Sequence, residues 1–144
     1  EDDEEEEQQQ QQQQPQVERM GEAAEVQARQ REVAGLLQHG KHREAVKAAL
    51  QNPPLGSHDQ AVKDMNTEVV LNAICSASDS EIDKIVADLY HNSSPDLCDT
   101  LVKYIYKGLA DRKYCGVLLK WHASAVNMAG LGPVVRAMTD RKTV

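Results

Sequence analysis

The side chains best suited to catalysis or metal binding are five histidines and three cysteines, spread over 144 residues. None of the histidines falls in an HExxH pattern or at the Cys/His spacing of a zinc site. His39 and His42 are three residues apart, but Gly40 between them interrupts the helix face that would have to hold both. The sequence therefore predicts no bound metal.

A cysteine nucleophile needs an oriented base within hydrogen-bond reach. Cys115 and His122 can share a helix face, but their spacing of seven residues separates them by about 10 Å along the axis. The three cysteines, which include Cys75 and Cys98, contain no close pair, and this argues against a disulfide framework and fits a reducing compartment. Phosphate-binding loops of the GxxxxGK[ST] or GxGxxG type are missing from the sequence as well. We therefore expect a protein that is not an enzyme and takes no cofactor.

The aromatic residues are few but clustered. The chain has one Trp, four Tyr and no Phe, and four of these five residues lie between positions 103 and 122. On a helix, Tyr106 points about 200° away from Tyr104, so the two rings cannot face the same neighbour. We expect Tyr104 and Trp121 to be core residues. For Tyr106 a core position and an interface position stay open, since an amphipathic ring on an outer face suits a contact with another protein.

Charge divides the chain into two parts. Residues 1–7 read EDDEEEE, Gln fills positions 8–14, and residues 1–16 contain no apolar side chain. We expect residues 1–16 to be a flexible polar leader or, alternatively, an acidic strip that docks on a basic partner surface. Of the 23 acidic residues, the 16 that follow this run of seven balance 16 Lys and Arg, which argues against nucleic-acid or membrane binding. Since no apolar run approaches ~20 residues, the pattern is typical of a soluble cytoplasmic protein.

Residues 17–144 show helical periodicity and no strand-like alternation. The expected helices span about 18–37, 42–51, 59–75, 79–89, 95–109, 113–128 and 133–139. Short connections between helices of this length predict one all-α domain, with about seven short helices in an α-α superhelix-like array. In such an array each helix is expected to pack mainly on its sequence neighbours.

Local signals refine this prediction. Gly40 is placed to adopt the left-handed conformation that closes the first helix. Ser78 and Glu81 have the spacing of a reciprocal capping box. We expect Gly108 to help end the fifth helix. The third helix is apolar over much of its circumference, which predicts a central position with neighbours on more than one side.

Five short segments, in order along the chain, resemble the family of the sixteen-kilodalton subunit (subunit 5) of the actin-related protein 2/3 complex. They are NPP at 52–54, AVKD at 61–64, YIYKG at 104–108, LLKWH at 118–122 and RKTV at 141–144. The resemblance runs from about Val33 to Val144. The chain departs from the family at Leu109, where Phe is usual, at Lys120, where Gln is usual, and in its leader, which has no interspersed apolar residues.

The resemblance implies a non-catalytic, all-helical structural subunit that supports nucleation of branched actin filaments, in the cytoplasm and the actin cytoskeleton. It also implies partners. The helical body would sit on the twenty-kilodalton subunit and near the WD-repeat propeller subunit, an N-terminal segment would help hold actin-related protein 2, and actin filaments would be contacted indirectly. ATP belongs to the actin-related subunits in that family, which agrees with the missing phosphate loop.

We predict interface or interface-supporting positions at Tyr106, Trp121, His122, Arg141, Lys142 and Val144. The alternative hypothesis is a free-standing helical adaptor that binds peptides in a groove between its helices. The two hypotheses differ in the surface they require. An adaptor is expected to have a polar exterior, whereas a subunit exposes apolar side chains until a partner covers them.

Overall fold

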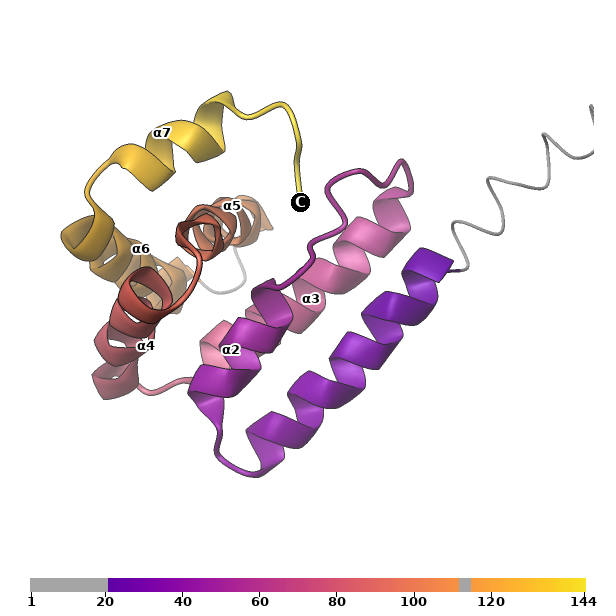
Figure 1. The fold of residues 1–144 in the computed structure, drawn as a ribbon, viewed down its shortest axis with the longest axis horizontal. Helices are drawn as coiled ribbons and strands as arrows, with labels where there is room; N and C mark the ends of the chain where they lie inside the picture. The colour runs from indigo at the N-terminus through magenta and orange to yellow at the C-terminus, as the bar shows by residue number, and fades with distance from the viewer. Residues whose placement is uncertain (1–20, 112–114) are drawn as a thin grey trace, which may run out of the picture.

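Every regular element in residues 21–111 and 115–144, the ranges that this computed structural model describes, is an α-helix (Figure 1). These ranges contain seven helices in one domain, which confirms the predicted all-α class. The predicted leader at residues 1–16, with its domain boundary at residue 17, lies outside the described residues and stays a prediction.

The first helix, residues 21–38, and α2, His42–Leu50, run antiparallel and are joined by a tight turn (Figure 1). Gly40 has a φ of 70°, the left-handed conformation predicted for it. Two backbone hydrogen bonds close the helix, from Lys41 N to the Leu36 oxygen at 2.9 Å and from Gly40 N to the Leu37 oxygen at 3.1 Å. This pair of bonds is the Schellman arrangement, in which the last carbonyls of a helix find donors just beyond its end.

The third helix, α3, spans Gln60–Ser76 and occupies the predicted central position. It begins at Asp59, whose carboxylate accepts a hydrogen bond from Ala61 N at 3.0 Å. It packs on α2 and also on α5, Pro95–Asp111. Its buried side chains include Val62 and Leu71, which lie about 180° apart around the helix. Because buried side chains occur on opposite sides of α3, it can hold both neighbours.

The next helix, α4, spans Asp79–Asn92, and its predicted capping box is wrong. Ser78 makes no side-chain cap bond. Its hydroxyl lies 3.1 Å from that of Ser80, while Glu81 N bonds to the Ser78 carbonyl oxygen at 3.0 Å. The helix therefore begins with a backbone hydrogen bond of the i to i+3 type, and the Glu81 carboxylate makes no capping bond.

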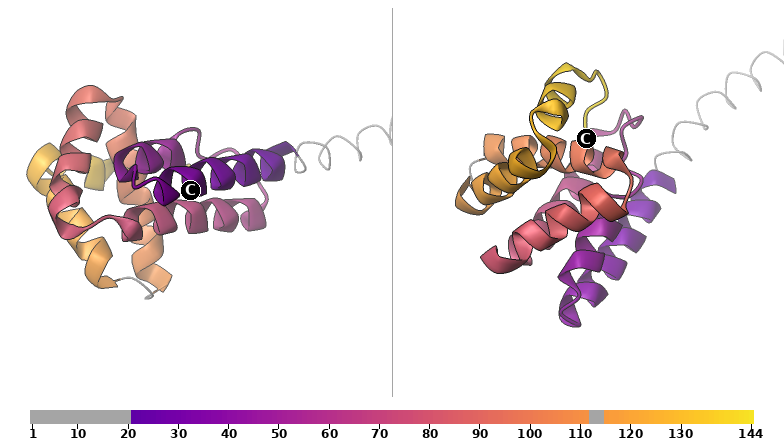
Figure 2. Two further views of the ribbon diagram at one scale, coloured as in Figure 1. Left: turned by 90° about the horizontal axis from the view of Figure 1, so that it is seen from below. Right: turned by 60° about the vertical axis from the view of Figure 1, so that its left-hand side comes forward.

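The last two helices are α6, which spans Cys115–Ala129, and α7, which spans Gly132–Thr139. Together with α4 and α5 they lie at one end of the three N-terminal helices (Figure 2). The predicted neighbour-to-neighbour packing is wrong in this part. The packing of α4 on α6 is more extensive than its packing on α5, and α5 packs on both α6 and α7. An amphipathic helix with a broad apolar face can be covered by two neighbours at once, and α5 uses its face in this way.

Gly108 does not help to end α5, as predicted, because the helix continues to Asp111. The glycine is buried where α5 meets two other helices. A Cβ atom placed on it would lie 2.7 Å from Leu118 Cδ1 of α6 and 2.9 Å from Leu71 Cδ2 of α3. The absence of a side chain thus lets three helices approach closely, which is why a poor helix former stands inside this helix.

Two aromatic side chains fill the centre, and both predictions of core position are confirmed. Trp121 and Tyr104 are completely buried. The indole Nε1 of Trp121 donates to the carbonyl oxygen of Ile74 at 2.9 Å. That carbonyl belongs to the last turn of α3, where backbone oxygens have no partner within the helix. The bond therefore joins α6 to the end of α3 and satisfies both groups.

A polar network supports the other aromatic residue. Asn66, fully buried on α3, donates from Nδ2 to the hydroxyl of Tyr104 on α5 and accepts at Oδ1 from Arg29 Nη1 at 2.5 Å. Burial raises the pKa of Tyr104 to about 12, although the bond to Asn66 and the charge of Arg29 act in the opposite direction. The network ties the first helix, α3 and α5 together.

Candidate interface surfaces

Two of the predicted interface residues touch each other. Tyr106 on α5 and His122 on α6 are half-buried. The Tyr106 hydroxyl lies 2.9 Å from His122 Nε2, and the rings meet edge to face with centroids 5.5 Å apart and planes inclined at 62°. Tyr106 therefore points away from the buried Tyr104, as the helical geometry predicts, and its hydroxyl end is held near the surface.

The C-terminal tail, residues 140–144, turns back toward α3 and α5 (Figure 1). Val144 is only 6% exposed, and its backbone oxygen accepts from Lys107 Nζ at 3.2 Å. Thr143 Oγ1 accepts from Lys63 Nζ at 3.2 Å. The last residues of the chain are thus held by lysines from two different helices.

A third lysine holds the beginning of the tail. Lys103 Nζ donates to Asp140 Oδ2 at 2.7 Å and to the Lys142 carbonyl oxygen at 3.1 Å. Lys142 N in turn donates to Asp140 Oδ1 at 3.0 Å. Arg141 and Lys142 are exposed. The backbone of this segment is therefore fixed while its basic side chains face solvent.

The tail, α5, α7 and the first residue of α3 border an open pocket of about 300 Å³, called here the tail pocket. Its walls are Gln60, Lys103, Tyr106, Lys107, Ala137, Lys142, Thr143 and Val144. Three of the six predicted interface residues line this pocket, and His122 is bonded to one of them. The structure therefore brings together residues from three distant parts of the sequence.

The other two predicted interface residues lie elsewhere. Arg141 is exposed beside the pocket without lining it. Trp121 is completely covered by the chain itself, so it can serve an interface only by supporting the helices around it. Participation of any of the six residues in an interface stays a prediction.

The carboxylates that hold the lysines have lowered pKa values. Hydrogen bonds from Gln60 and then from Lys107 lower the pKa of Asp64. A hydrogen bond from Lys103, followed by one from a backbone N–H of the tail, lowers the pKa of Asp140. Hydrogen bonds to the ionised form always act in this direction. Both carboxylates therefore stay charged at neutral pH and pair with the lysines.

An apolar stripe on α7 was not anticipated among the interface residues. Leu131, just before the helix, Val135 and Met138 are 65%, 54% and 72% exposed. Their i, i+4 and i+7 spacing places them on one face of α7, opposite the buried Pro133. The sequence contained this information, because apolar residues at i, i+4 and i+7 form one apolar face of a helix, and such a face usually packs against another element or a partner.

An ion pair joins α7 to α5. Arg136 Nε and Nη2 donate to the two carboxylate oxygens of Asp99 on α5 at 2.6 and 2.9 Å. Such a two-pronged pair fixes orientation as well as distance. The three apolar side chains, called here the α7 stripe, are thus presented by an anchored helix.

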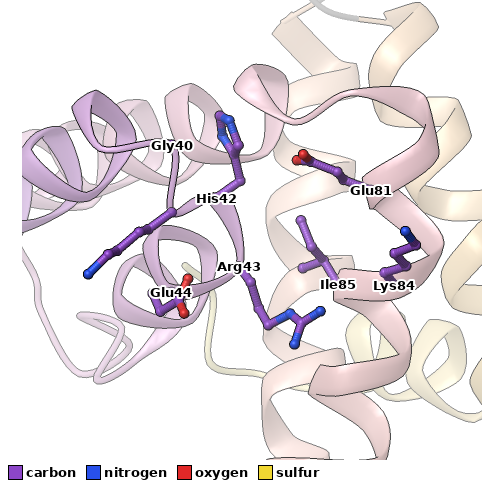
Figure 3. Close-up of a pocket in the computed structure, with 8 residues that line it drawn as sticks. Gly40, His42, Arg43, Glu44, Glu81, Lys84 and Ile85 are labelled. Atoms are coloured by element: carbon purple, nitrogen blue, oxygen red, sulfur yellow. The ribbon is translucent and has the colours of Figure 1, made fainter.

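A second pocket, of about 360 Å³, lies between the start of α2 and α4 (Figure 3). His42 and Arg43 face it from α2, and Glu81, Lys84 and Ile85 face it from α4. The Glu81 carboxylate, freed from the expected capping box, points toward the α2 side, and its Oε2 atom is buried with no hydrogen-bond partner among the described residues. The pocket carries both signs of charge, so its chemistry selects no ligand class.

Groups for metal or covalent chemistry are not assembled in the described part of the chain. Within it, no cluster of three or more His, Cys, Asp or Glu residues could hold a metal ion. Cys75 and Cys98 are free thiols, and burial raises the pKa of each, which makes them poor nucleophiles. The side chain of Cys115 lies outside the described set. The described helices also include none with the length and hydropathy to cross a bilayer.

Comparison with known proteins identifies the family. The chain matches the ARP2/3 complex 16 kDa subunit (p16-Arc) family over residues 1–144. It belongs to the p16-Arc family. The Dictyostelium discoideum actin-related protein 2/3 complex subunit 5 is 34% identical over 121 residues, which cover 84% of this chain and 85% of that protein.

Vertebrate members of the p16-Arc family are similarly related. The Homo sapiens actin-related protein 2/3 complex subunit 5-like protein is 40% identical over 131 residues, covering 90% of this chain and 83% of that protein. The Xenopus laevis subunit 5-C is 40% identical over 115 residues, covering 78% of this chain and 74% of that protein. The family resemblance expected from the five sequence segments is confirmed.

Proposed function

We propose that this protein is a non-catalytic structural subunit of the actin-related protein 2/3 complex, which supports nucleation of branched actin filaments through protein-protein contacts. Membership of the p16-Arc family over residues 1–144 carries this proposal. The relatives named above are subunits of that complex by their own names. The actin cytoskeleton is the corresponding site of action.

The α7 stripe supports a subunit over a free-standing adaptor. An adaptor that is stable alone is expected to have a polar exterior, yet Leu131, Val135 and Met138 are all more than half exposed on one face. A contiguous apolar face on an anchored helix is the arrangement that a permanent partner covers. We assign the α7 stripe to a contact with another subunit of the assembly.

We propose three partners within the complex, in line with the family resemblance. The helical body contacts the twenty-kilodalton subunit and lies near the WD-repeat propeller subunit, and the N-terminal segment contributes to holding actin-related protein 2. The tail pocket and the α7 stripe are the two surfaces through which the body makes its contacts. The described residues do not include the N-terminal segment, so its role rests on family membership alone.

Affinity purification of the tagged full-length chain from its own cells tests this proposal. The wild-type chain is expected to bring down the actin-related proteins and the propeller subunit in stoichiometric amounts. The double variant Val135→Ser, Met138→Ser is expected to lose most of this recovery while keeping its circular dichroism spectrum. Leu119→Ser is the matched control, because Leu119 is an equally exposed apolar residue, at 56%, on a different helix, α6.

One result would contradict the subunit role, and another would contradict only the assignment of the α7 stripe. Absence of the actin-related proteins from the wild-type purification would remove the subunit role. Equal recovery by the wild type, the stripe variant and the Leu119→Ser control would leave the subunit role intact but would withdraw the α7 stripe as a contact.

A further inference from the structure

We propose that the tail pocket binds an acidic segment of another polypeptide, with one carboxylate side chain seated among Lys103, Lys107 and Lys142. This inference rests on the proposed function only for the expectation that a partner polypeptide is present. The binding chemistry comes from the pocket itself.

The first argument is the local charge. The residues that line the tail pocket include three lysines and no acidic residue. With Lys63 and Arg141 beside it, the corner carries five cations, against the carboxylates of Asp64 and Asp140 and the terminal carboxylate of Val144, which leaves an excess of two positive charges. This excess stands out because the chain beyond residue 7 has equal numbers of acidic and basic residues. A localised excess of this kind attracts an acidic partner group.

The second argument is the number of unused donors. An ammonium group has three N–H donors. Lys103 uses two, on Asp140 and on the Lys142 carbonyl oxygen, and Lys107 uses two, on Asp64 and on the Val144 oxygen. Each therefore keeps one donor, in an orientation fixed by its two bonds. A carboxylate, which accepts at two oxygens, matches two such donors.

The third argument is Lys142. Both hydrogen bonds that the structure gives this residue use its backbone, and its side-chain ammonium acts on Asp140 only through a longer-range Coulomb interaction, without a hydrogen-bond or ion-pair partner among the described residues. It lines the pocket and is exposed. Its three donors are therefore available to a ligand, and removing its charge leaves the tail contacts in place.

The fourth argument is the shape and polarity of the walls. Ala137 and Val144 contribute apolar surface, and the hydroxyl of Tyr106 is occupied by His122. These walls suit the methylene stem of a Glu side chain whose carboxylate reaches the lysines. A volume of about 300 Å³ accommodates one or two side chains. The adjoining Asp64 and Asp140 would repel the continuous phosphates of a nucleic acid, whereas a peptide can place a single carboxylate between them.

The test uses the purified full-length protein and a fluorescent heptaglutamate peptide, with a heptaglutamine peptide as the uncharged control. Binding is followed by fluorescence anisotropy at low and high salt. We expect the heptaglutamate peptide alone to bind and its affinity to fall as the salt concentration rises. Lys142→Gln is expected to weaken binding about threefold to fivefold, the size of one exposed charge pair. Lys84→Gln, which removes the same charge at the other pocket, is the matched control and should leave the affinity unchanged.

Three outcomes would overturn the inference. Equal losses in the Lys142→Gln and Lys84→Gln variants would mean that the peptide responds to overall charge rather than to the tail pocket. No binding at any salt concentration would also reject it. Binding that appears only when the seven acidic residues at positions 1–7 are replaced by amides in the full-length chain would identify the occupant as this chain's own leader and not another polypeptide. Because none of these measurements uses the assembled complex, their failure is distinct from a failed affinity purification.

Discussion

Two regions of the molecule differ in how far their side chains are buried. One is the centre, where α3, α5 and α6 meet, and the other is the C-terminal edge, formed by α7 and the tail. In the centre Trp121 and Tyr104 are fully buried, and each side-chain polar group finds a partner inside the protein. At the edge, Val135 and Met138 are exposed, and Lys142 has its side chain in solvent. The side chains at the centre are covered and hydrogen-bonded within the protein, whereas those at the edge are free to contact a partner. A subunit of an assembly needs both kinds of region.

The largest effect is expected at the centre, from Trp121→Ala. Removing a fully buried indole should lower the free energy of unfolding by about 3 to 5 kcal/mol, and the Ile74 carbonyl oxygen loses its donor. Urea denaturation followed by circular dichroism measures this, because the variant lacks the only Trp fluorophore. Trp121→Phe should cost less. A loss below about 1 kcal/mol in Trp121→Ala would show that the centre is not closely packed.

Tyr104→Phe is expected to cost about 1 to 3 kcal/mol, because the buried Nδ2 atom of Asn66 loses its acceptor. In the wild type, ionisation of Tyr104 also makes the free energy of unfolding depend on pH. The pKa of Tyr104 is raised to about 12 in the folded state, so the stability linked to it is present below about pH 10 and is lost as the pH rises toward 12. Denaturation at pH 8 and pH 11 should show a smaller alkaline loss in Tyr104→Phe. Equal alkaline losses in both proteins would contradict this assignment.

A pair of glycine substitutions compares close packing with open space. Gly108→Ala gains about 1 kcal/mol in helix propensity, but its Cβ would meet two buried leucines, and overpacking costs about 1 to 3 kcal/mol. We expect a net loss of up to about 2 kcal/mol. Gly35→Ala in the first helix meets nothing within 4 Å and should gain about 0.5 to 1 kcal/mol. Thermal denaturation distinguishes the two, and a stabilised Gly108→Ala would mean that the helices do not approach closely there.

The α7 stripe should show the opposite behaviour to the centre. Because Val135 and Met138 are exposed, replacing each with Ser should change the free energy of unfolding by no more than about 0.5 kcal/mol. Urea denaturation of the isolated protein measures this beside Trp121→Ala. A loss comparable to that of Trp121→Ala would place these side chains in the protein's own core and would remove the distinction between the two regions.

The smallest effect is expected in the tail, when a fall in pH protonates the carboxylates of Asp64 and Asp140. The pKa values of Asp64 and Asp140 are lowered in the folded state, so their contribution is present above their ordinary values, about pH 4, and is lost as the pH falls through the lowered values. The backbone amide resonances of Thr143 and Val144 should therefore hold their positions from neutral pH to about pH 4 and shift below it. Asp140→Asn should loosen the tail already at neutral pH. Resonance shifts centred near pH 6.5 would instead connect the tail to a histidine.

The helices themselves were predictable because their signals are local. The third helix was expected at about 59–75 and is found at Gln60–Ser76, and Gly40 adopts the predicted left-handed conformation. Two predictions were wrong because the sequence pattern behind each is compatible with two different structures. A glycine inside an apolar helix, such as Gly108, can end the helix or let a neighbour approach, and the sequence is the same in both cases. Ser78 and Glu81 had the right spacing for a capping box, but Ser78 makes no side-chain cap bond.

The candidate interface could be predicted in part. The aromatic cluster and the RKTV end suggested Tyr106, Lys142 and Val144, and the structure places these three around one pocket. Nothing in the sequence indicated that Lys103 and Lys107 would hold the tail, because these contacts join residues 37 to 39 positions apart. Trp121 was predicted both as core and as interface support; its complete burial confirms the core position, and the supporting role stays a prediction.

The sequence by itself determined that this protein is helical, where its helices lie and to which family it belongs, because these properties depend on neighbouring residues and on short segments in order. The tertiary structure alone decided which faces of those helices are covered. Helical periodicity fixes how side chains lie relative to one another on one helix, but not which helix will pack against them. For that reason the apolar side chains of the α7 stripe are exposed, whereas those of α3, such as Val62, Val70 and Ile74, are buried.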